Sequence, residues 1–262
     1  MENTKIGSIT IIFVFIFGLL YVISLDPIAQ DVAYHAFADQ RTCFSIHNFW
    51  NVISNIPFFI VGCMGIYSIY FTHKIKFLSD MKPAYTLFFI GVSSVAFGSS
   101  YYHLWPNNDT LVWDRLPMTV AFMSLFSIII GEFTSSRYGK LSLWPLVIFG
   151  AYSVIYWQIT ESEGSGDLRL YILVQFLPIL IIPLMLLFFK AAYTNIKGYW
   201  LLLFAYVLAK ILEHFDSQIY NNFITISGHS VKHVIAALGV YLLLVSFNNR
   251  ESTWKKKDFQ SP

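Results

Sequence analysis

Hydrophobic residues along the chain gather in blocks that are separated by short polar segments. Most of the blocks approach the ~20 residues that a helix needs to cross the hydrocarbon core of a membrane. This pattern predicts an all-α protein, a polytopic transmembrane helical bundle with a seven-helix core and one extra N-terminal span. The predicted spans cover residues 6–24, 50–72, 84–104, 116–133, 141–160, 169–189, 199–220 and 230–247.

The same pattern predicts the organisation of the chain. We expect an N-terminal transmembrane span at 1–25, an outward-facing loop at 26–49, the seven-helix core at 50–247 and a cytoplasmic tail at 248–262. The first block could instead belong to a signal peptide, but "SLDPIAQD" after it is a poor match to a cleavage site. We therefore interpret the block as an uncleaved span. The loop is long enough to cover the outer end of the bundle.

Composition agrees with a membrane protein. Only 12% of the residues are charged, whereas a soluble domain carries roughly 25%. The net charge of +2 and the lack of a basic stripe give no reason to expect a nucleic-acid partner. The two cysteines, Cys43 and Cys63, do not show a spacing typical of a metal site or a disulfide framework.

Basic residues predict the orientation, because near the ends of spans they remain on the cytoplasmic side of the membrane. When the loops alternate between the two sides, the outer side receives only Arg41, Arg115 and Arg169. We therefore expect a multi-pass protein with both termini in the cytoplasm. The other basic residues outside the spans fall on the cytoplasmic side: Lys5, Lys74, Lys76, Lys82, Arg137, Lys140, Lys190, Lys197, Arg250, Lys255, Lys256 and Lys257.

Polar residues at the predicted outer ends of the spans suggest chemistry. His229 and His233 are four residues apart, so in a helix they share one face at about 6 Å and can reach one cation. Ser99 and His103 repeat this spacing on another span. A third imidazole from His103 would leave a fourth position open, as in catalytic zinc sites. Interfacial or merely hydrogen-bonded histidines, and a serine bonded to its own helix, are the alternatives.

Asp114 has two interpretations. Pro117 is tolerated best in the first turn of a helix, which predicts Asp114 as the N-cap of the following span. Alternatively, a carboxylate beside a metal-activated water could act as its general base or orient it.

Span seven carries further charges. Lys210 and Glu213 can pair at i,i+3. Glu213 and Asp216 could form a mutually neutralising network with Lys232 of the last span, or Asp216 could orient a metal-ligating imidazole. We do not count His214 as a ligand, because it points elsewhere on its helix. Three loop histidines are expected to be solvated: His35, His47 and His73.

Three segments resemble the alkaline ceramidases and the wider membrane-hydrolase superfamily that includes the adiponectin-receptor-like proteins. They are "NFWNVISNIPF" at 48–58, "GSSYYHLWPNNDTLVWDRLPM" at 98–118 and "GHSVKH" at 228–233. The motif of that family is Ser-x-x-x-His on one span, Asp at the start of the next and His-x-x-x-His on the last. The resemblance covers residues 39 to 247, the seven-helix core.

The resemblance implies a site and an activity. Zinc would be held by His103, His229 and His233, and a zinc-activated water would attack an amide carbonyl. Asp114 would act as general base and acid, and Ser99 would stabilise the oxyanion. The expected substrate is ceramide or a related N-acyl lipid, cleaved to a sphingoid base and a free fatty acid near the outer face of the membrane.

One departure concerns calcium. Animal members of the family carry an acidic calcium-binding cluster, including a glutamate just ahead of "FWN". Here that position is Asn48, and in the upstream stretch "ADQRTCFSIH" only Asp39 is acidic. We therefore do not expect the activity to depend on calcium.

Two other function classes remain open. The same fold can serve a receptor or sensor with a structural or vestigial metal site, and intramembrane Lys, Glu and Asp residues can form the path of an ion- or proton-coupled transporter. Retention of all five site positions favours the enzyme. The sequence shows neither the repeated halves nor the helices broken at mid-membrane that many transporters have. It makes no prediction of the oligomeric state.

Overall fold

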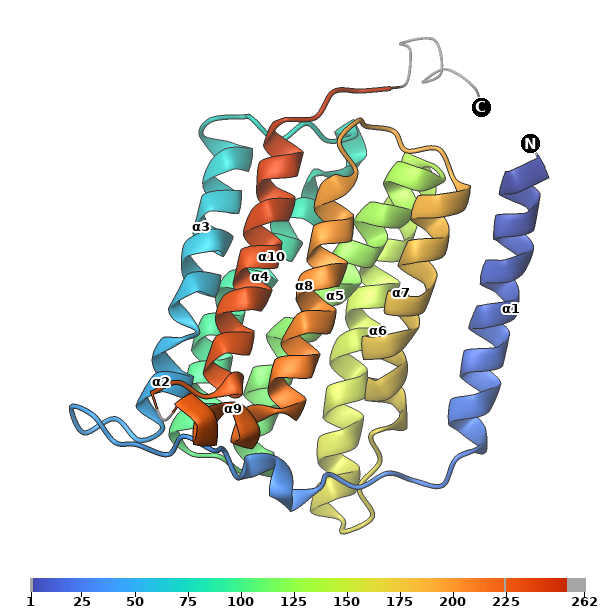
Figure 1. Ribbon diagram of the computed structural model, residues 1–262. Helices are drawn as coiled ribbons and strands as arrows, with labels where there is room; N and C mark the ends of the chain where they lie inside the picture. The colour runs from blue at the N-terminus through green and yellow to red at the C-terminus, as the bar shows by residue number, and fades with distance from the viewer. Residues whose placement is uncertain (1, 224, 254–262) are drawn as a thin grey trace.

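The described part of the structure, a computed structural model, comprises residues 2–223 and 225–253 and is helical without strands. Its long helices stand side by side (Figure 1), as predicted for a helical bundle. The elements are α1 Glu2–Ser24, η1 Val32–His35, α2 Phe49–Ile53, α3 Ile56–Tyr70, η2 Ser79–Met81, α4 Lys82–Leu104, α5 Asn108–Phe133, α6 Ser136–Ser162, α7 Arg169–Phe188, α8 Lys197–His214, α9 Asp216–Phe223 and α10 Gly228–Asn248.

Length and composition make several of these helices fit to cross a membrane. Six candidate spans occur among the described residues, or seven if α8 and α9, which are bent by 72°, form one broken span. Helix α4 is not among them, because its serine, glycine and tyrosine residues lower its mean hydropathy, but it lies within the bundle (Figure 1). The protein is thus a polytopic helical membrane protein, and the expected total of eight spans stays a prediction.

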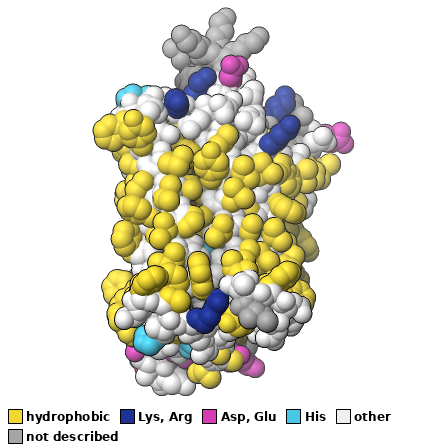
Figure 2. All heavy atoms as spheres, turned by 60° about the vertical axis from the view of Figure 1, so that its left-hand side comes forward, with side chains coloured by type: hydrophobic (Ala, Val, Ile, Leu, Met, Phe, Trp, Pro, Cys, Tyr) yellow, Lys and Arg dark blue, Asp and Glu magenta, His cyan; other side chains and the backbone are white. Residues whose placement is uncertain are grey.

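The surface has the pattern expected of such a protein. Figure 2 shows a wide hydrophobic belt, with most of the visible Lys and Arg side chains at the upper end. Large apolar side chains such as Phe13, Phe97 and Phe204 are exposed on the bundle because their solvent is lipid.

Helix α1 stands at one edge of the bundle and contacts α7 (Figure 1). Its small residues allow this approach: an added Cβ at Gly7 would meet Phe188, and one at Gly18 would meet Leu177. The beginning of α1 and the end of α10 lie at the same end of the bundle. The expected extra N-terminal helix is therefore present, packed outside the others.

Helix α5 begins earlier than the sequence pattern predicts. Asn107 is its N-cap: the Asn107 side chain accepts from the Thr110 N–H at 2.9 Å, and the Thr110 hydroxyl accepts from the Asn107 N–H at 3.3 Å. Asp114 therefore lies almost two turns inside the helix, and the interpretation of Asp114 as an N-cap is wrong. Pro117 lies within α5 as well, because the polar turn before Asn107 already supplies a better helix start.

Pro117 lies where α5 and α4 approach each other most closely through Gly98. Pro117 has no N–H, so the carbonyl of Trp113 loses its partner in the helix. Gly98 of α4 lies directly against that carbonyl, where an added Cβ would come within 1.9 Å of the oxygen. This close approach brings the following residue of α4, Ser99, next to Asp114 of α5.

Candidate metal centre

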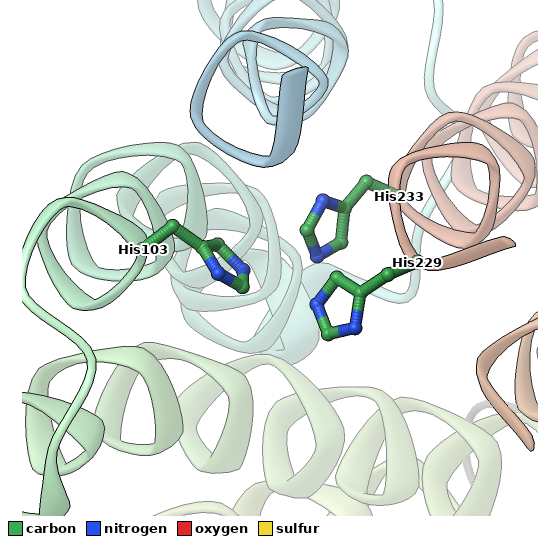
Figure 3. Close-up of side chains that lie close together, drawn as sticks. All are labelled: His103, His229 and His233. Atoms are coloured by element: carbon green, nitrogen blue, oxygen red, sulfur yellow. The ribbon is translucent and has the colours of Figure 1, made fainter. Parts of the chain in front are cut away.

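Three histidines from two helices meet at the lower end of the bundle in Figure 1. His103 lies in the last turn of α4, and His229 and His233 lie in the first two turns of α10. Their ring centroids are 4.9 to 5.0 Å apart in all three pairings. Figure 3 shows the rings turned toward one another, and their potential ligand atoms all lie within 4.8 Å. The structure thus brings together the three histidines that the sequence singled out.

Burial makes the nitrogens of this cluster costly unless they find a partner. The residues are 1, 5 and 7% exposed, respectively, and Phe37 of the 26–49 loop packs on His103 and His229 with ring centroids 4.7 Å away. Both ring nitrogens of His103 and Nε2 of His229 are buried without a hydrogen-bond partner. Buried polar atoms are nearly always paired, so these atoms fit a site for a cation. Three imidazoles suit zinc or a similar transition metal.

The third histidine is oriented by its neighbours. His233 Nδ1 lies 2.8 Å from the Ser54 hydroxyl, which lies just before α3. This leaves Nε2 for a metal, and such an outer hydrogen bond is typical of metal-ligating histidines. The backbone of His103 is held by Asn48, whose amide donates to the His103 carbonyl at 2.8 Å. Sequence reasoning assigned no role to Ser54, although it lies within the segment "NFWNVISNIPF".

Ser99 and Asp114 complete the group. Ser99 lies one turn from His103 on α4, is 1% exposed and has the Asp114 carboxylate as a polar neighbour. Both residues line one cavity together with His233. The five predicted site residues therefore meet at one end of the bundle.

The cavity has a volume of about 290 Å³ and two different ends. Near the histidines its lining is polar and charged; farther into the bundle it is formed by side chains such as Phe88, Leu125 and Val240. The polar and charged lining residues at the histidine end are Tyr34, Ser99, Asp114, Arg115, Tyr171, Lys210, Glu213, Lys232 and His233.

The charged side chains of α8 and α9 have two different kinds of partner. Glu213 forms ion pairs with Lys210, at 2.7 Å, and with Lys232. Asp216 stays outside this network: its carboxylate accepts the backbone N–H of His229 at 2.7 Å and of Ala38 at 3.0 Å. The neutralising network is therefore formed without Asp216. Asp216 holds the backbone at the start of α10, where a carboxylate is favourable, rather than an imidazole.

The 26–49 loop lies over this end of the bundle, and its polar residues are engaged. His35, expected to be solvated, is half-buried and bonds the Tyr102 hydroxyl and the Asn108 amide oxygen, each at 2.8 Å. Burial raises the pKa of Tyr34, so its hydroxyl stays protonated and donates to Glu213 at 3.4 Å. Such contacts follow from the packing of the loop and leave no signal in the sequence.

Asp39 and Arg41 form a closed pair in the same loop. The guanidinium donates to Asp39 Oδ1 at 2.8 Å and to Oδ2 at 2.5 Å, and the backbone N–H of Arg41 also donates to Oδ1 at 3.1 Å. Arg41 further donates to the Thr225 carbonyl at 2.8 Å, which ties the loop to the segment before α10. The one acidic residue in the stretch "ADQRTCFSIH" is thus already neutralised.

A second buried charge cluster lies at the opposite end of the bundle. Glu132 of α5 is 1% exposed and pairs with Arg250, 2% exposed, at 2.7 Å. Tyr85 and Tyr199 donate their hydroxyls to Glu132, and Arg250 also donates to the Lys76 carbonyl at 2.9 Å. Sequence reasoning missed this carboxylate–guanidinium cluster, because its charges are more than a hundred residues apart along the chain.

Comparison with curated proteins gives no match. Comparison with protein families matches residues 39–261 to the Ceramidase family, that is, most of the chain including every residue of the metal centre. The family is one of hydrolases that act on an amide bond. The arrangement of the histidines, Ser99 and Asp114 agrees with the resemblance seen in the sequence, and this chain belongs to the Ceramidase family.

Proposed function

We propose that this protein is a zinc-dependent intramembrane lipid amide hydrolase that cleaves ceramide to a sphingoid base and a free fatty acid. One observation carries the proposal. Three buried imidazoles meet beside a cavity that His233 lines and that is apolar farther in, and both ring nitrogens of His103 and Nε2 of His229 lack a hydrogen-bond partner. Such a cavity suits a substrate with an amide at one point and an acyl chain beyond it.

The histidines would bind the metal. His103, His229 and His233 would hold zinc through three imidazoles and leave a fourth position open. Once bound, zinc supplies a Lewis acid that acidifies a water molecule.

Asp114 and Ser99 would carry out the proton transfer and the charge stabilisation. Asp114 would accept a proton from the attacking water and deliver it to the leaving amine nitrogen as the amide C–N bond breaks. The water oxygen would join the acyl carbon, which yields the free fatty acid. Ser99 would donate a hydrogen bond to the carbonyl oxygen as negative charge develops on it.

The apolar part of the cavity would bind the acyl chain. Along α4 the lining runs from Ser99 through Val95 and Val92 to Phe88, a distance of about 16 Å at roughly 1.5 Å per residue. A lipid tail fits this lining, because burial of each CH₂ group contributes about 0.8 kcal/mol. An ion path would need polar groups along its whole length, which argues against a transporter.

We also propose that the metal centre faces the outer side of the membrane, with both termini in the cytoplasm. The proposal rests on the distribution of lysine and arginine, which gather at the opposite end of the bundle. Reporter fusions after residue 80 or 140 should be found in the cytoplasm, and fusions within 160–168 outside it. The reverse pattern would refute this orientation.

Asp114→Asn tests the chemistry. The amide cannot accept the proton of the water, so fatty-acid release from ceramide should fall about 100- to 10,000-fold while zinc content stays at the wild-type level. Ser99→Ala should cost less, about 100- to 1000-fold, as expected for the loss of one oxyanion donor. Exposed Asp109, also on α5, provides the matched control Asp109→Asn, which should remain active. A fully active Asp114→Asn variant would exclude this mechanism.

A further inference from the structure

Arg115 is a buried cation that lacks a carboxylate partner. It is 6% exposed, its Nη2 donates to the Gln30 side-chain oxygen at 2.5 Å, and its Nη1 is buried without a hydrogen-bond partner. Among the described residues it forms no ion pair. Three other arginines each pair with a carboxylate: Arg41, Arg169 and Arg250.

The surroundings of Arg115 offset only part of the cost of burial. Its guanidinium lies 4.3 Å from the ring centroid of Trp157 and 4.7 Å from that of Tyr171. Cation–π contacts of this kind stabilise a cation by less than the cost of burying an unpaired charge. The arginine would therefore gain from an anionic partner.

Arg115 lies next to the proposed reaction centre but on another side of it. It follows Asp114 on α5, and successive residues of an α-helix are about 100° apart around its axis. Asp114 therefore faces Ser99 on α4, whereas Arg115 faces α6 and α7 through Trp157 and Tyr171. Both residues line the same cavity.

The charges at this end of the cavity are not balanced. Glu213 is shared by two lysines, Lys210 and Lys232, which leaves the surplus positive charge without a carboxylate. Asp114 is the other carboxylate in the lining, and it forms no ion pair with Arg115. The polar end of the cavity thus favours an anion even before a metal ion is bound.

We propose that Arg115 binds an anionic group on the amine side of the substrate, so that ceramides and related N-acyl lipids whose head group carries a carboxylate, phosphate or sulfonate are cleaved in preference to those with a neutral head group. This inference rests on the proposed function. With the amide at the metal centre and the acyl chain among the apolar residues of the cavity, the head group would lie beside Arg115 at the polar end. Guanidinium groups recognise such anions through charge-assisted hydrogen bonds. Nη1 of Arg115 can donate such a hydrogen bond, because it has no other partner.

Two amides with one acyl chain provide the test. N-palmitoylglycine carries a carboxylate where N-palmitoylethanolamine carries a hydroxyl. The wild-type protein should hydrolyse the anionic amide with a kcat/KM about 10- to 100-fold higher, as expected for one hydrogen bond to a charged group. Arg115→Gln should abolish this ratio, and Arg115→Lys should keep part of it. The control is Arg137→Gln, an exposed arginine at the start of α6, which should keep the full ratio.

A binding measurement separates failure of the subsite from failure of the proposed function. In the Asp114→Asn protein, N-palmitoylglycine should raise the melting temperature in detergent more than N-palmitoylethanolamine does, and Arg115→Gln should remove the difference. Equal binding and hydrolysis of the two amides would overturn the subsite and leave the amidase intact. Selective binding without hydrolysis of any N-acyl lipid would refute the amidase and retain the subsite. If palmitate depends on Arg115 as strongly as N-palmitoylglycine does, the arginine binds a fatty-acid carboxylate and this assignment is wrong.

Discussion

Two buried clusters of polar groups, one near each end of the bundle, differ in how completely their members are paired. At one end, Glu132 accepts from two tyrosines and pairs with Arg250, whose remaining donors reach Lys76 and Tyr85. At the other end, both ring nitrogens of His103, Nε2 of His229 and Nη1 of Arg115 are buried without partners.

The difference separates structural polar groups from functional ones. The polar groups of the carboxylate–guanidinium cluster are paired with one another and need no ligand. The cluster therefore serves to join α5, α4, α8 and the segment that follows α10. Unpaired buried donors and acceptors cost about 1 to 3 kcal/mol each. A protein retains such a cost where a ligand removes it. This contrast supports the proposal that the histidine cluster is a binding site, and its unpaired nitrogens fit a cation.

The largest effect is expected from breaking the histidine cluster. Replacement of His229 and His233 together by alanine should reduce bound zinc and ceramide hydrolysis to background, because one imidazole cannot hold the ion. Metal analysis of the purified protein and fatty-acid release measure both. His214→Ala is the control, since His214 is exposed at the end of α8. Full zinc occupancy in the double variant would end the assignment of the metal centre.

Breaking the opposite cluster should affect stability instead of metal binding. Glu132→Gln leaves Arg250 buried without its countercharge, which should lower the free energy of unfolding by about 3 to 5 kcal/mol. Zinc per folded molecule should stay unchanged. Combining Glu132→Gln with Arg250→Met should recover part of the loss, because both charges are then gone. Unfolding in detergent measures the effect, with exposed Glu163→Gln as control. Loss of zinc in a folded Glu132→Gln protein would show that the two ends are coupled.

The smallest effect is expected from calcium. Both carboxylate oxygens of Asp39 are occupied by Arg41, and Asn48 uses its amide on the His103 carbonyl. Calcium added to a zinc-loaded, calcium-stripped preparation should therefore change the hydrolysis rate little. Saturable activation by several-fold would contradict this and would mean that other oxygens of the loop bind the ion.

Much of the site could be anticipated from local spacing. His229 and His233 share a helix face wherever that helix lies, and Ser99 and His103 do the same on α4. The prediction for Asp114 as an N-cap was wrong, because it placed the helix start near Pro117. The cap is Asn107, seven residues before Asp114. The roles of Ser54, Asn48 and Arg115 were not foreseen, since each depends on a partner from a distant segment.

By itself the sequence determined the helical bundle and the membrane as its solvent. Both follow from local chemistry, because long apolar blocks can satisfy their backbone in lipid only as helices. The tertiary structure alone decided which polar groups find partners. Glu132 and Arg250 pair at one end, and at the other end three histidines meet with both ring nitrogens of His103 and Nε2 of His229 left without a partner. The packing of helices settles such pairings because the side chains involved are far apart along the chain.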